Sequence, residues 1–298
     1  MHKTIVLILM TLISSYSWGQ TNYEKFKKLF SEKDTTNIQS LLKDWRKTNP
    51  NDPELYTSEF NYYFTNSKKE VISIEQSTPK REAFQLTDGS GNIAGYLTSN
   101  LNYDQNNIEK ALNIIDEGIK KFPDRLDMRF GKIYALGEIQ DYSNFTKSII
   151  QTINYSINNK NKWLWTENKN QDDAENFMLG TVQTYLKQLY DTEDDSLLPN
   201  MIEIGEVTLN YYPENVEILS TTSIALLLTE NYDKAIHYLK KAEKINPKDY
   251  IVLNNIAQAY KIKGDKTNAI KYYELTKKYG DEQAKYQAQQ NIQLLKKP

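Results

Sequence analysis

The chain has 298 residues, with 37 Lys and Arg against 39 Asp and Glu, so its formal net charge is -2. Charges of both signs are mixed along the sequence, which excludes a basic face extensive enough to bind nucleic acid or an anionic membrane. A mean hydropathy of -0.69 beside 12% aromatic residues favours thin helical layers over one thick core.

The first 19 residues have the features of an export signal. His2 and Lys3 precede an apolar run from Ile5 to Ile13, and cleavage after Gly19 fits the preference for small residues at such sites. The run is too short to span a bilayer stably, and no later segment reaches about 18 apolar residues. We therefore expect a protein exported to the periplasm or the extracellular medium, without a stable membrane span after cleavage. The alternative is an N-terminal anchor that stays attached.

Apolar residues at helical spacing predict helices along most of the remaining chain. We expect degenerate repeat helices over 20–67, a β-hairpin insertion over 68–102, degenerate helix pairs over 103–213, two clear repeat units within 214–283 and a polar capping helix over 284–298. The individual helices are predicted at 22–32, 36–48, 53–66, 106–121, 124–139, 142–158, 171–190, 196–211, 214–229, 232–245, 249–262, 265–279 and 281–296.

The hydrophobic period changes to two between residues 68 and 102. Val71, Ile72 and Ile74 lie before the glycine-rich turn 88–92, and further alternating apolar residues flank it, which is typical of a hairpin. Because an isolated hairpin is marginal in water, we expect this one to pack on the helices or on a partner.

A polar loop at 159–170 carries Trp163 and Trp165. Aromatic side chains in such a loop either attach it to the neighbouring helices or present themselves to a ligand. The sequence favours attachment, because partly buried aromatics are common in loops without a function.

Two adjacent 34-residue units, 216–249 and 250–283, each consist of two helical patterns separated by a turn. Leu253, Ala257 and Tyr260 in the first helix of the second unit, with Ala269 in its second helix, resemble the pattern of the tetratricopeptide repeat family. Thr222 and Ser223 depart from the Leu-Gly pair that is usual there. The resemblance implies an all-α superhelix (α-α solenoid). With the hairpin predicted over 68–102, the expected fold is such a superhelix with a small β-hairpin insertion.

The same resemblance implies that a protein or peptide partner binds in a concave groove. The family's carboxylate clamp is missing, since Ser220 and Ile224 stand at its places. Family geometry then points to groove contacts from Ile224, Leu227, Asn254, Gln258 and Lys261. The loop residues Trp163 and Trp165 are further candidate contacts. The predicted function is a non-enzymatic interaction scaffold of the cell envelope.

An enzyme is least favoured, and no catalytic, cofactor-binding or metal-ligating residue is predicted. Without cysteine, and with His237 alone outside the signal, no Cys/His metal cluster can form. The oxygens of the turn from Asp88 to Asn92 do not match a calcium loop, so a plain turn is favoured. The acidic pairs at 172–173 and 194–195 precede helices, where capping is their expected role.

A carbohydrate- or nutrient-binding envelope protein is the alternative function. It would use Trp163, Trp165 and Tyr96 as surfaces on which sugars stack.

Overall fold

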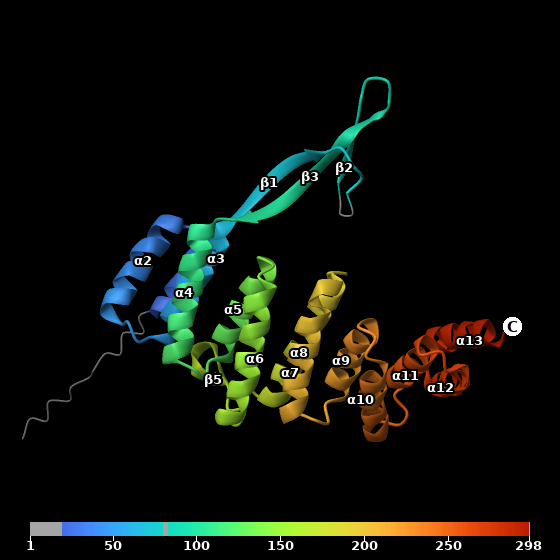
Figure 1. The fold of residues 1–298 in the computed structure, drawn as a ribbon. Helices are drawn as coiled ribbons and strands as arrows, with labels where there is room; N and C mark the ends of the chain where they lie inside the picture. Colours follow the sequence, from blue (N-terminus) through green and yellow to red (C-terminus); the bar gives the residue numbers. More distant parts are fainter. Residues whose placement is uncertain (1–19, 80–82, 298) are drawn as a thin grey trace, which may run out of the picture.

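Helices follow one another along nearly all of the chain in the computed structural model, which describes residues 20–79 and 83–297. They form one continuous array of antiparallel rods, and a narrow arm of strands leaves this array near its N-terminal end (Figure 1). The predicted all-α superhelix with a small β insertion is confirmed. The predicted export signal lies outside the described residues. No helix of the described part is both long and apolar enough to cross a membrane.

The helices begin and end within a few residues of the predicted ranges. They are α1 (Asn22–Ser31), α2 (Thr35–Thr48), α3 (Pro53–Ser67), α4 (Gln105–Lys121), α5 (Leu126–Glu138), α6 (Tyr142–Asn158), α7 (Ala174–Asp191), α8 (Leu198–Tyr211), α9 (Val216–Leu228), α10 (Tyr232–Ile245), α11 (Tyr250–Ile262), α12 (Lys266–Tyr279) and α13 (Glu282–Lys296).

Short acidic or amide side chains begin many of these helices. Asp104 accepts a hydrogen bond from the backbone N–H of Asn107, and Asp265 accepts one from that of Asn268. Such caps satisfy N–H groups that have no partner inside the helix. The helix starts are therefore set by local chemistry that the sequence displays directly.

Neighbouring helices bury their apolar sides in two contiguous cores, one under α1–α5 and the other under α5–α13. The close contact between α8 and α9 explains the departure at Thr222. Gly205 of α8 lies directly against the Thr222 side chain, so the small residue at this crossing is supplied by α8.

The arm consists of β1 (Lys68–Glu75), β2 (Phe84–Thr87) and β3 (Ile93–Tyr103), in the order β1-β3-β2 with antiparallel pairs. It is inserted between α3 and α4, which pack against each other. The predicted turn joins β2 to β3, and β1 adds a third strand beyond the simple hairpin. The base of the arm packs on helices, where the Tyr103 ring stacks on Phe64 of α3. Beyond that base the arm projects away from the helical array (Figure 1).

Two short segments complete the fold. The loop after α6 contains β4 (Leu164–Trp165), a 3-10 turn η1 (Thr166–Asn168) and β5 (Lys169–Asn170), with β4 and β5 antiparallel. A second 3-10 turn, η2 (Asp195–Leu197), leads into α8.

Candidate partner-binding surface

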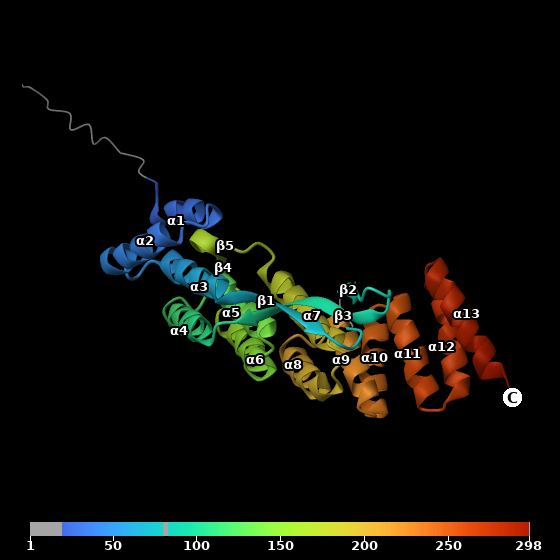
Figure 2. The same cartoon turned by 90° about the horizontal axis from the view of Figure 1, so that it is seen from above.

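The first helices of successive pairs, α7, α9, α11 and α13, lie in the C-terminal half of the array (Figure 2). Helix α9 contacts both α7 and α11. Helix α13 is joined to α11 by the Tyr250 hydroxyl, which donates to Asp281 Oδ2 at 3.0 Å. We call the surface of these four helices the A-helix face.

Two open hollows lie between neighbouring helices of the A-helix face. The hollow between α7 and α9 has a volume of about 380 Å³, with Lys187 and Tyr190 on one side and Thr221 and Ile224 on the other. The hollow between α11 and α13 has a volume of about 250 Å³ and includes Asn254 among its lining residues. Both hollows mix apolar and polar groups.

Four predicted contact residues belong to this face. Ile224 lines the first hollow and Asn254 the second. Gln258 follows Asn254 by one helical turn and is half-buried. Lys261 lies one turn further along and donates from Nζ to Asn291 Oδ1 of α13 at 2.7 Å, so part of its hydrogen-bonding capacity is already used.

Leu227 does not reach the surface. Its side chain is only 8% exposed and belongs to the core. Other helices pack around α9, and its residues are apolar on nearly every side. The spacing of its apolar residues therefore does not distinguish groove positions from core positions. The prediction that Leu227 contacts a partner is therefore unsupported by its position.

Trp163 and Trp165 hold their loop on the helices, as the sequence favoured. Trp163 is 1% exposed, and the Arg129 guanidinium lies 5.6 Å from its ring centroid. Trp165 is half-buried and packs edge-on against Phe130 and Phe177. Burial lowers the pKa of Arg129 to about 10. Of the three aromatic residues considered for sugar stacking, Trp163 is therefore buried, whereas Trp165 and Tyr96 are each half-buried.

A buried ion-pair network also holds the loop at 159–170 in place. Arg125 is 1% exposed and donates to Glu54 Oε1 at 2.7 Å and to both carboxylate oxygens of Asp127 at 2.8 and 2.7 Å. Burial opposes the charge on Arg125, but hydrogen bonds to Asp127 and Glu54 outweigh it and raise its pKa. The backbone N–H of Glu167 in η1 also donates to Glu54 Oε1. The network therefore joins α3, α5 and the loop.

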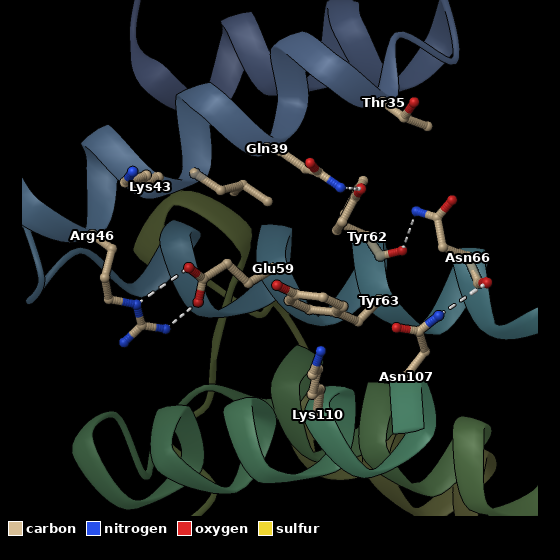
Figure 3. A pocket seen from close by; sticks show the side chains of 11 residues that line it. Thr35, Gln39, Lys43, Arg46, Glu59, Tyr62, Tyr63, Asn66, Asn107 and Lys110 are labelled. Carbon is tan, nitrogen blue, oxygen red and sulfur yellow. Dashed lines mark hydrogen bonds and ion pairs between the residues drawn. The ribbon is translucent and has the colours of Figure 1, made fainter. Parts of the chain in front are cut away.

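A second candidate surface, which the sequence did not reveal, is a polar cleft of about 780 Å³ between α2 and α4 (Figure 3). Its floor is formed by one stripe of α3 at helical spacing: Glu59, Tyr62, Tyr63 and Asn66. The helical spacing of these four residues can be seen in the sequence. The separation of α2 from α4, which exposes them in a cleft, cannot.

Hydrogen bonds and charges fix the side chains of this cleft (Figure 3). Gln39 donates to the Tyr62 hydroxyl at 2.7 Å, and Arg46 is paired with Glu59. Hydrogen bonding to Glu59 raises the pKa of Arg46, whereas burial is the main cause of the raised pKa of Tyr63. The lining contains neither histidine nor cysteine. The cleft thus offers donors, acceptors and both signs of charge, an arrangement suited to binding.

The other polar residues singled out in the sequence lie exposed on a helix or take part in a turn. His237 is exposed on α10. The Asp88 carboxylate accepts the backbone N–H groups of Ser90 and Asn92, which makes the plain turn predicted for it and lowers its pKa. Within residues 20–79 and 83–297, no acidic or histidine group is arranged to hold a metal ion.

One of the two acidic pairs caps a helix turn as predicted. Asp194 accepts the N–H of Ser196 at 2.9 Å at the start of η2. Asp173 occupies the N-cap position of α7 in a left-handed conformation, but its carboxylate accepts from the Asn176 side chain and from no backbone N–H of the helix.

The model of the tetratricopeptide repeat family matches residues 223–249 and 250–275. No curated protein matches the chain. Among solved structures, the C-terminal part of a repeat-containing protein from Cytophaga hutchinsonii is 13% identical, covers 92% of this chain and 95% of its own, and has a TM-score of 0.41.

Two further solved structures are similar at the same level. A tetratricopeptide repeat protein from Parabacteroides merdae is 13% identical over 93% of this chain and 87% of its own, with a TM-score of 0.38. YrrB, described as a repeat protein with an unusual peptide-binding site, is 14% identical over 84% of this chain and 97% of its own, with a TM-score of 0.40.

Proposed function

We propose that this chain, in which two tetratricopeptide repeats are recognisable at residues 223–249 and 250–275, is a non-enzymatic scaffold that holds a segment of a partner protein on the A-helix face. Stacked repeats present extended surfaces of this kind to partner proteins.

One observation carries the choice of surface: the hollows between successive first helices are lined by side chains from both helices. Asn254 of α11 and Gln287 of α13 line the same hollow, and Gln258 lies next to it on α11. Amide side chains both donate and accept hydrogen bonds, as the backbone of an extended peptide requires.

Site-specific photo-crosslinking tests the surface. A photoreactive residue at Gln258 should capture a partner segment in cells, whereas the same residue at exposed His237 on α10 should not. Capture at both positions with equal yield, or at His237 alone, would remove the A-helix face from consideration.

Binding of the captured segment, made as a synthetic peptide, then measures the contribution of the face. We expect Asn254→Ala with Gln258→Ala to weaken binding about tenfold or more, because each truncation removes hydrogen bonds at the interface. His237→Ala is the matched control and should leave the affinity unchanged. Circular dichroism of each variant confirms that the helices are intact.

We also propose that the scaffold works outside the cytoplasm, in the periplasm or the medium, on the strength of the N-terminal signal pattern. Cell fractionation of the full chain checks this. Recovery of an unprocessed protein in the cytoplasmic fraction alone would contradict it.

A further inference from the structure

The arm exposes an unusual amount of apolar surface for a segment in water. Ile72, Ile74 and Phe84 are 66%, 61% and 79% exposed, and Val71, Ile93 and Leu101 are exposed as well. In addition, β1 is an edge strand along all eight of its residues, because within residues 20–79 and 83–297 it pairs with β3 on one side only. Open strand edges are features that proteins normally cover, and exposed apolar patches mark surfaces of interaction.

The two faces of the arm differ in chemistry. Residues opposite each other in an antiparallel pair share a face, so Ile74, Leu97 and Phe84 lie together, and Ile72 lies on the same side. This mainly apolar face contains an open hollow of about 750 Å³ lined by Ile72, Phe84 and Leu97. Polar groups border it where Ser99 Oγ donates to Glu70 Oε1 at 2.6 Å. The other face is polar, for instance where the Ser73 and Thr98 hydroxyls are 3.0 Å apart.

We propose that β1 pairs antiparallel with β1 of a second copy of this chain, about a two-fold axis at Ile72. A two-fold interface requires a surface that is complementary to itself. Centred on Ile72, the strand meets this condition, because Lys69 then lies opposite the partner's Glu75. The arrangement is independent of the A-helix face and goes beyond the proposed scaffold function.

The side-chain alternation restricts the register further. Centring the pair on a residue keeps both apolar faces on the same side of the joined sheet, whereas a slip by one residue would place them on opposite sides. Centres at Val71 or Ser73 also keep the faces together, but they place Lys69 opposite the partner's Ser73 or Ser77. Of these three centres, only the one at Ile72 also places opposite charges against each other.

Lys69 has the capacity for this second contact. It donates to Asp104 Oδ2 at 2.8 Å, yet its side chain remains 61% exposed, and an ammonium group has three donors. A cross-strand pair of opposite charges stabilises a sheet, and like charges opposite each other destabilise it. Because of the two-fold axis, each cross-strand charge pair occurs twice in the dimer.

A charge exchange gives the sharpest test, read out as oligomeric state by sedimentation equilibrium of the full chain. Lys69→Glu alone and Glu75→Lys alone should each weaken the dimer about tenfold, because each places like charges opposite each other at two positions. An equimolar mixture of the two variants should restore a dimer, since both contacts in the mixed pair join Glu to Lys. Because the mixture contains the same two chains, restoration cannot be attributed to misfolding of either.

Cross-linking tests the register itself. The chain has no cysteine, so Ile72→Cys introduces a single thiol on the proposed axis. Directly opposite residues have Cα atoms about 4.5–5.5 Å apart, within the range of a disulfide. Mild oxidation should therefore yield a covalent dimer of Ile72→Cys. The matched variant Val71→Cys should remain monomeric on a denaturing gel, because its thiols lie diagonally across the axis.

Three results would overturn the proposal. These are a chain that is monomeric at every concentration, a mixture of charge variants that stays monomeric, and equal cross-linking at positions 71 and 72. Binding of the monomeric chain to phospholipid vesicles, lost in Phe84→Ser, would assign the apolar face to a membrane surface instead.

Discussion

Replacing Gly205 by alanine should place a methyl group where no space exists between α8 and α9. The added Cβ would lie 2.8 Å from Thr222 Cγ2 and 2.9 Å from Thr222 Cβ, closer than carbon atoms approach without a shift of the helices. Overpacking of this kind costs about 1–3 kcal/mol. Alanine is favoured over glycine inside a helix by about 1 kcal/mol, so the net loss of stability for Gly205→Ala is about 0–2 kcal/mol.

A double-mutant cycle separates the two contributions. In a Thr222→Gly background the clash is absent, so Gly205→Ala should stabilise the protein by about 1 kcal/mol through helix propensity alone. The coupling between the two positions is then about 1–3 kcal/mol. Urea denaturation followed by far-UV circular dichroism measures it from the midpoints and slopes of the four proteins. A coupling below about 0.5 kcal/mol, with Gly205→Ala having the same effect in both backgrounds, would refute the close packing of α8 on α9.

Three further predictions follow from the buried network, the loop and the helix caps. Arg125→Ala leaves two buried carboxylates without their cation and should lower the unfolding free energy by about 3–5 kcal/mol in urea denaturation, against under about 0.5 kcal/mol for exposed Lys169→Ala. Trp163→Ala should lower the unfolding free energy by about 3–5 kcal/mol in the same assay. An unchanged denaturation midpoint would mean that the indole does not hold the loop. The pKa values of Asp265 and Asp281 are lowered, first by hydrogen bonds from backbone N–H groups. Their contribution to stability is therefore present above the ordinary carboxyl pKa and is lost as the pH falls through the lowered one. Asp265→Asn with Asp281→Asn should flatten the decrease in melting temperature below about pH 4, and an unchanged slope would contradict the role of these caps.

The predicted groove contacts were based on the geometry of the repeat family, and they agree with the structure only in part. Ile224, Asn254, Gln258 and Lys261 lie on the A-helix face. Leu227 is buried although it follows Ile224 by three residues, because neighbouring helices enclose α9 on more than one side. A helical period identifies a face only when one side of the helix meets water.

The sequence by itself determined the helix boundaries, the repeat phase and the turn at Asp88, because each depends on groups a few residues apart. A cap such as Asp265 acts on a backbone N–H three residues away, and the Asp88 turn is closed by its own carboxylate. Tertiary structure decided the burial of Trp163, the opening of the cleft between α2 and α4, and the projection of the arm beyond the helices. Each of these depends on how elements far apart in the chain approach one another, and a local pattern of residues contains no measure of that distance.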